Sequence, residues 1–374
     1  MSEVRELLTI LVTTYNRYTR LQRLLRYWRR VPTGCPVVIL DSSSDAIDPS
    51  IPAACAELGA QLTRFAPSTP PMEKMCAGLA GVTTPYAVFW ADDDFLVPES
   101  LREAVRFLES HDDRVAVHGE AALFMTGQPD QPGSVACMPY RQRSLTDATA
   151  AERIADHFQY YSVLNYATHR TAALRRHVEL CAAHGFGYAW GELALGGLSA
   201  ASGRVTKLPG LYLLKETHAD MDSWNPVGHR LTVCDWMTGR SFAEQYPAFC
   251  ECLGQAVAER DGLSLDDGRR LVRVALWTYL AGQINTEIRD AVAPSTGRRR
   301  AHAWRSWLAK IPGLRALRRA LRDAEPANMT TAGMLRPRSP YHDAFAPVWY
   351  AIAKSVEPVR MAQSIDEQTT AVAR

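Results

Sequence analysis

Residues 86–94 read Tyr86-Ala87-Val88-Phe89-Trp90-Ala91-Asp92-Asp93-Asp94, an apolar run followed at once by three aspartates. The apolar part is long enough for one buried strand. Because burying ionised carboxylates is costly, we expect the aspartates at the solvent edge of a sheet, with a positive charge nearby. Aspartate oxygens suit Mg²⁺ or Mn²⁺, which commonly keep open positions for substrate phosphates. This stretch therefore predicts metal-dependent phosphate chemistry.

The first half of the chain alternates strand-like and helix-like segments. Apolar patterns predict strands over 8–12, 37–40, 61–65 and 86–90, and helices over 18–28, 72–81 and 98–108. This order predicts an α/β, Rossmann-like fold with a mainly parallel sheet flanked by helices. Such sheets bind ligands at the carboxyl ends of their strands. We therefore expect the turn after Val12, the serines after Leu40 and the aspartates after Trp90 on one edge.

The second half is mostly helical. Residues 152–202 predict helices, 204–216 predict a strand pair interrupted by Pro209-Gly210, and a capping box at Ser264 predicts a long helix. The character of the sequence changes beyond Trp224. We therefore expect one domain over 1–225 and a helical C-terminal region over 226–374.

Composition narrows the function class. The chain has 374 residues, with 42 basic against 40 acidic residues, a balance that disfavours a nucleic-acid partner. Its start lacks the pattern of a secretion signal, and no segment reaches the roughly 18 apolar residues of a membrane span. The eight cysteines show no Cys-x-x-Cys spacing. We expect a cytoplasmic protein with reduced thiols.

Three motifs carry a family resemblance. The motifs are residues 8–17, residues 38–45 and Ala91-Asp92-Asp93-Asp94 with Pro98 after it. Together they resemble the nucleotide-sugar-binding half of family-2-like glycosyltransferases with a GT-A fold. The resemblance covers roughly residues 7–220. It implies transfer of a sugar from a nucleoside diphosphate donor, most often a UDP-sugar, usually with inversion at the anomeric carbon.

The resemblance also implies which residues contact the donor. They are Thr13, Thr14, Tyr15, Asn16 and Arg17 on the nucleotide, Asp41 on the base or ribose, and Ser43, Lys74 and Asp92 around them. Ordinary turn and cap chemistry explains Asn16 and the serines equally well.

The aspartates resemble the family's Asp-x-Asp metal motif in one of two registers. Counting back from Pro98 selects Asp93 and Asp94, whereas reading the three acids directly selects Asp92 and Asp94. His218 follows the last expected strand, where the family often completes a Mn²⁺ or Mg²⁺ site, and Asp220 and Asp222 are weaker substitutes. A solvated acidic turn without metal is the alternative.

The catalytic base is expected at Glu192, which lies in a segment resembling the family's acceptor-side helix start. The family typically has two acids there, and here Leu193 replaces the second. The alternative is an exposed first-turn glutamate favoured by the helix dipole.

The resemblance predicts a metal-dependent inverting glycosyltransferase that acts on a glycan or lipid-linked saccharide in polysaccharide biosynthesis. Two rivals stay open: a sugar-nucleotide or alditol-phosphate transferase on a related fold, and a non-catalytic sugar-nucleotide-binding subunit. Segment 298–322 carries nine Lys or Arg residues and no acid. It predicts a peripheral membrane contact or a basic solvated helix, with a nucleic-acid contact disfavoured by the near-neutral net charge.

Overall fold

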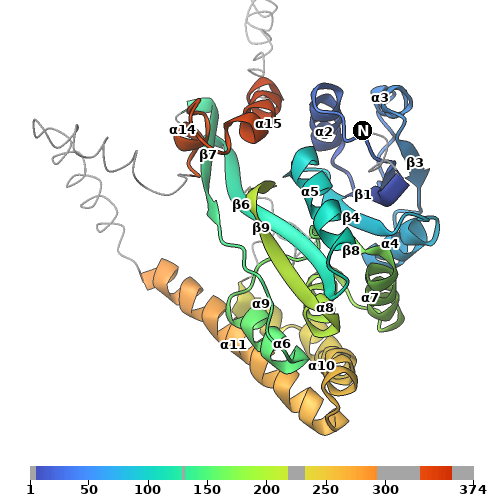
Figure 1. The fold of residues 1–374 in the computed structure, drawn as a ribbon, viewed down its shortest axis with the longest axis vertical. Coiled ribbons are helices and arrows are strands. Elements are labelled where there is room, and N and C mark those ends of the chain that lie inside the picture. The colour runs from blue at the N-terminus through green and yellow to red at the C-terminus, as the bar shows by residue number, and fades with distance from the viewer. Residues whose placement is uncertain (1–5, 129–130, 218–231, 293–328, 356–374) are drawn as a thin grey trace, which may run out of the picture.

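The computed structural model describes residues 6–128, 131–217, 232–292 and 329–355. Its centre is a nine-stranded sheet in the order β3-β2-β1-β4-β8-β6-β9-β5, with β7 paired to β6 (Figure 1). The strands are β1 (Leu8–Thr14), β2 (Val37–Asp41), β3 (Gln61–Arg64), β4 (Tyr86–Ala91), β5 (Phe95–Leu96), β6 (Arg114–Gln128), β7 (Gln131–Tyr140), β8 (Thr168–Arg170) and β9 (Arg204–Glu216).

The sheet is mixed but mainly parallel. Strands β3, β2, β1 and β4 are parallel neighbours, and β9 is parallel to β6. Because β8 is antiparallel to both β4 and β6, those two strands also share one direction. The predicted α/β class with a mainly parallel sheet flanked by helices is confirmed. The carboxyl ends of β1, β2 and β4 meet at one edge, as expected.

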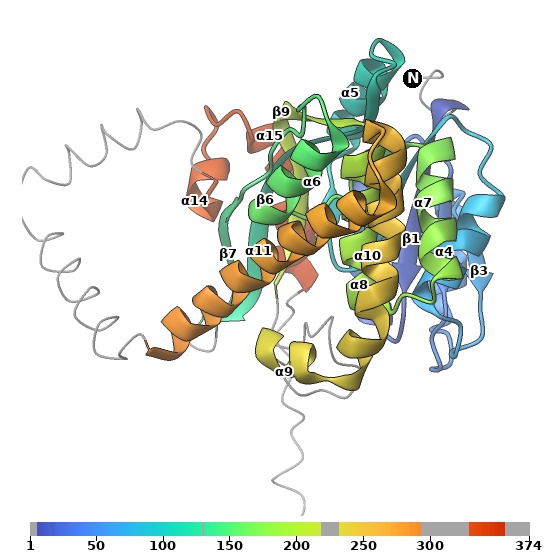
Figure 2. The ribbon, with the colours of Figure 1, turned by 90° about the horizontal axis from the view of Figure 1, so that it is seen from below.

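Helices cover both faces of the sheet (Figures 1 and 2). They are α2 (Tyr18–Arg30), α3 (Ser50–Leu58), α4 (Pro71–Ala80), α5 (Pro98–Glu109), α6 (Ala150–Gln159), α7 (Thr171–Ala183), α8 (Tyr188–Ser202), α9 (Val233–Thr238), α10 (Arg240–Asp261), α11 (Leu265–Val292), α14 (Thr331–Met334) and α15 (His342–Ser355). Ser264 accepts a hydrogen bond from the Asp267 N–H (3.1 Å), so the predicted cap does start the long helix α11.

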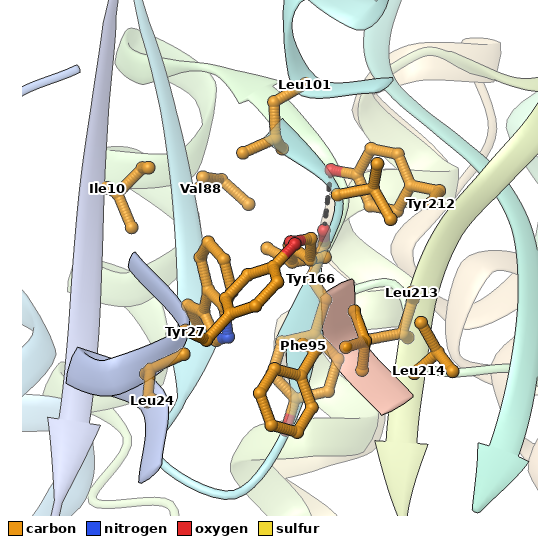
Figure 3. Packing of buried hydrophobic residues seen from close by; sticks show 14 of the residues in the cluster. Ile10, Leu24, Tyr27, Val88, Phe95, Leu101, Tyr166, Tyr212, Leu213 and Leu214 are labelled. Carbon is orange, nitrogen blue, oxygen red and sulfur yellow. Dashed lines mark hydrogen bonds between the residues drawn. The ribbon is translucent and has the colours of Figure 1, made fainter. Parts of the chain in front are cut away.

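The alternation of side chains along the strands divides the core in two. Ile10 and Val88 point into a cluster with α2, α5 and α15, whereas Leu11 and Phe89 point into a cluster with α4, α8 and α10. Figure 3 shows the first cluster, where the Tyr27 and Phe95 rings meet edge to face at 5.2 Å. The Tyr212 hydroxyl donates to the Tyr166 carbonyl there (2.8 Å).

One expectation about strands needs correction, and one strand pair was not expected. Residues 204–216 form one strand, not a pair, and its register against β6 shifts at the position of Pro209-Gly210. Gly210 has a positive φ (100°), a conformation that lets the chain accommodate the register shift. Pro209-Gly210 therefore interrupts the regular pairing of the strand without ending it. The antiparallel pair β6 and β7 is an element that the sequence patterns did not suggest.

The C-terminal helices pack onto the earlier part of the chain. Helices α10 and α11 share a core with α6 and α8, and α15 lies against α2, where Arg30 covers the Tyr350 ring. The domain boundary near residue 225 stays a prediction, and segment 298–322 lies outside the described residues. None of the described helices has the length and apolar content needed to cross a membrane.

Candidate active site

The aspartates after β4 lie at the predicted edge but are buried, with 1 %, 5 % and 1 % exposure for Asp92, Asp93 and Asp94. The expected solvent exposure was therefore wrong. Asp92 Oδ2 accepts from the Thr14 hydroxyl (2.6 Å), and Asp94 Oδ1 accepts from the Glu216 N–H (2.8 Å). Asp92 Oδ1 and Asp94 Oδ2 are buried without any hydrogen-bond donor in the described part of the chain. Burial raises the pKa of both carboxyls.

Two cations supply the positive charge that the sequence led us to expect. Arg17 Nη1 binds Asp93 Oδ2 (2.5 Å) and lies 3.7 Å from Asp92 Oδ1. Lys215 Nζ lies 3.9 Å from Asp94 Oδ2. Burial alone would lower the pKa of Lys215, but the charges of Asp94 and Glu192 reverse this and raise it. The cluster is thus compensated by protein cations, which explains why it tolerates burial.

A buried ion pair between Arg23 and Glu216 lies next to the aspartates. Arg23 donates from both Nη atoms to Glu216 (3.0 and 2.6 Å) and from Nη2 to the Asp93 carbonyl (2.8 Å). Its guanidinium also lies over the Phe95 ring at 5.3 Å. Sequence reasoning missed Arg23 and Glu216, because 193 positions separate them and only the fold brings them together.

The carboxylate after β2 is fully engaged. Asp41 Oδ2 accepts from the Tyr18 hydroxyl (2.8 Å) and from Arg64 Nη1 (2.7 Å), and its Oδ1 accepts from the Ser43 N–H (2.8 Å). Burial opposes the charge, but these donors outweigh it and lower the pKa of Asp41. Arg64, whose side chain is 40 % exposed, was also missed by sequence reasoning. Asp41 therefore positions a guanidinium at the strand ends.

The turn after β1 is bonded to the turn after β2. Asn16 adopts a positive φ of 53°, its N–H donates to Ser43 Oγ (2.8 Å), and its side-chain oxygen accepts from the Ser44 N–H (2.9 Å). Thr13 is half-buried and Tyr15 is exposed. The geometry of Asn16 matches the turn chemistry weighed as its alternative.

The side chain of Lys74, on α4, extends to the carboxyl ends of β1 and β2. Its ammonium donates to the Thr14 carbonyl (3.0 Å) and to Ser42 Oγ (2.8 Å). Burial lowers the pKa of Lys74 to about 8, although the charges of Asp41 and Asp92 oppose the shift. This places a buried amine between the two acidic strand ends.

Glu192 approaches the acidic cluster from α8. It is the fifth residue of that helix, in the second turn and not at the helix start as expected. Its Oε1 accepts from the Tyr161 hydroxyl (3.0 Å), whose pKa is raised by burial and then by the Glu192 charge. The charges of both Glu192 and Asp94 raise the pKa of Lys215, so the candidate base and the cluster act on the same ammonium.

The metal assignment stays a prediction. His218, Asp220 and Asp222 lie outside the described residues. Within those ranges, no three His, Cys, Asp or Glu side chains form a group that could hold a metal ion. In donor chemistry, the buried carboxylate oxygens Asp92 Oδ1 and Asp94 Oδ2 are of the kind that Mg²⁺ or Mn²⁺ prefers.

Comparisons with known proteins give only distant similarity. No family model and no curated protein matches the sequence. The structure resembles S. aureus TarS residues 1–349 in complex with UDP-GlcNAc, with 14% identity and a TM-score of 0.49 over 94% of this chain and 90% of that one. For the complex of the same fragment with UDP, the values are 15%, 0.44, 96% and 92%. Similarity at this level assigns neither a family nor an activity.

Proposed function

We propose that this protein is a metal-dependent, inverting glycosyltransferase that uses a nucleoside-diphosphate sugar. The observation that carries the proposal is the pair of buried oxygens on Asp92 and Asp94 at the carboxyl ends of parallel strands. An unsatisfied buried carboxylate oxygen is costly in the free protein, so a ligand that engages it gains affinity. The motif order quoted above supports the same activity.

Each residue then has a defined role. Glu192 takes the proton from the acceptor hydroxyl as the hydroxyl oxygen attacks the anomeric carbon. The bond between that carbon and the diphosphate breaks, and its electron pair stays on the phosphate oxygen. Arg17 and Lys215, which lie beside Asp93 and Asp94, are the cations proposed to stabilise that developing negative charge. Tyr161 holds the Glu192 carboxylate in place.

The proposed metal is Mn²⁺ or Mg²⁺, held by Asp92 and Asp94. When bound, it would neutralise charge on the diphosphate. Asp93 is the less suitable ligand of the three, because its Oδ2 already binds Arg17. A ligand role for His218 remains a prediction, as do a cytoplasmic location, a glycan or lipid-linked acceptor and a membrane contact through 298–322.

Product analysis tests this proposal directly. The chain is incubated with Mn²⁺ and a panel of nucleotide sugars, beginning with UDP-GlcNAc, and the released nucleotide is identified. Glycosyl transfer or donor hydrolysis releases a nucleoside diphosphate. Release of pyrophosphate would instead identify a nucleotidyl transferase, and donor binding without turnover of any acceptor would identify a binding subunit.

A further inference from the structure

The outer face of α11 exposes large apolar side chains. Val274, Trp277 and Ile288 are 63 %, 44 % and 54 % exposed. The opposite face, with Val272 and Leu276, is fully buried in the core shared with α6 and α10. Figure 2 shows α11 running along the outside of the helical layer. Helix α10 accounts for part of the Trp277 contact, since Trp277 Nε1 donates to the Tyr246 hydroxyl (3.1 Å). An amphipathic helix needs only one apolar face to pack on its own domain, so Val274 and Ile288 require another explanation.

The second face has a regular spacing. Val274, Trp277, Ala281, Ile284 and Ile288 follow one another at steps of three and four residues, and we call them the α11 stripe. At 100° per residue they lie within an arc of about 80° and extend over about 21 Å. Ala281 is exposed and Ile284 is half-buried. This is the spacing with which two helices pack along a common seam.

Charges beside the stripe select the partner and its direction. Arg273 and Glu287 each precede a stripe residue, Val274 and Ile288, so they occupy the same position relative to the seam. When two copies of α11 pack antiparallel with Val274 of one near Ile284 of the other, Arg273 of each copy faces Glu287 of the other. A parallel pair brings no such opposite charges together. The surface is therefore complementary to itself.

Both charged groups are available for this contact. Among the residues described, no carboxylate lies within ion-pair distance of Arg273, whose Nε donates only to the Arg269 carbonyl (3.4 Å). Glu287 uses Oε1 to accept from the Val233 N–H (2.6 Å), which fixes the carboxylate on α11. Its other oxygen can accept from a guanidinium.

We propose that the α11 stripe is a two-fold interface with a second copy of this chain. The two α11 helices pack antiparallel, bury the stripe, and form two reciprocal Arg273–Glu287 ion pairs. This proposal is independent of the proposed catalytic function, since it uses no residue of the candidate active site.

Charge reversal tests the proposal on the full chain by sedimentation equilibrium. The wild type should form a dimer. Arg273→Glu and Glu287→Arg, measured separately, should each weaken the dimer by about tenfold or more, because each places like charges together twice. An equimolar mixture of the two variants should recover the wild-type affinity as a heterodimer, in which both pairs are again opposite in charge.

Controls separate the interface from folding. Arg240→Glu reverses a highly exposed charge on α10 and should leave the dimer unchanged. Glu287→Gln keeps an oxygen for the Val233 N–H, so its thermal unfolding should match the wild type. A monomeric wild type, or a mixture no tighter than the single variants, would overturn the proposal. So would a monomer whose binding to anionic lipid vesicles is lost in Val274→Ser/Ile288→Ser, since the stripe would then face a membrane.

Discussion

The carboxylates that end β2 and β4 occupy equivalent places beside β1, but their bonding differs. Asp41 after β2 has donors on both oxygens, whereas Asp92 and Asp94 after β4 each keep one buried oxygen without a donor. A carboxylate whose oxygens are both hydrogen-bonded stabilises its own turn. A buried carboxylate oxygen without a hydrogen bond destabilises the free protein, so a ligand that engages it binds more tightly. Asp41, at the carboxyl end of β2 (the β2 end), thus holds Arg64 in place. Asp92 and Asp94, at the carboxyl end of β4 (the β4 end), are the residues proposed to bind a metal ion.

The largest expected effect lies beside the β4 end. Glu192→Gln keeps the size of the side chain and an oxygen for the Tyr161 hydroxyl but cannot take a proton. Turnover should fall by about 10²- to 10⁴-fold, with donor affinity nearly unchanged. Steady-state kinetics with the identified donor and acceptor measures this, and Glu244→Gln on an exposed face of α10 serves as control. Turnover within about threefold of wild type would exclude Glu192 as the base.

A second substitution removes the support of the β4 end. Arg23→Met leaves Glu216 buried with its main partner gone, so the free energy of unfolding should fall by about 3–5 kcal/mol. Chemical denaturation measures the loss. The double variant Arg23→Met/Glu216→Leu removes both charges and should lose less than the single one. An equal or larger loss in the double variant would show that the pair contributes through packing and not through charge.

A third experiment compares the two strand ends directly. Asp92→Asn/Asp94→Asn should abolish the enhancement of nucleoside diphosphate binding by Mn²⁺, a loss of about 10- to 100-fold or more in calorimetric titrations. Asp41→Asn should keep that enhancement and instead lower the free energy of unfolding by about 1–3 kcal/mol, because Arg64 and Tyr18 lose an acceptor. Retention of the enhancement in the double variant would contradict the metal assignment.

Local patterns predicted the elements that bring these residues together. The strands β1, β2 and β4 and the helices α2 and α5 follow from apolar spacing, and their order placed Thr14, Asp41 and Asp92 on one edge. The bonding state of each carboxylate had no local signal. For Asp94 it depends on Glu216 and Lys215, which lie more than 120 positions beyond it and reach it only because β9 is part of the same sheet.

Pro209-Gly210 shows a second limit of local patterns. The dipeptide is typical of a turn, yet pairing with β6 on both sides keeps the strand continuous. Sheet pairing is a long-range contribution that a local pattern does not contain. The pair β6 and β7, by contrast, joins two consecutive strands, so distance along the chain does not explain why it was missed.

The smallest expected effect tests Lys74, which lies between the two strand ends. Its pKa of about 8 in the folded protein is below the 10.5 of a free lysine, so the unfolded chain binds more protons between these values. Stability should therefore rise with pH in this window, as the penalty for burying the charged amine is relieved. Relative to Lys74→Met, the wild type should gain roughly 1–2 kcal/mol in unfolding free energy from about pH 8 to 9.5. Urea unfolding of both proteins across this range measures the difference. Parallel pH profiles would mean that Asp41 and Asp92 together keep the amine charged and that burial does not lower the pKa of Lys74.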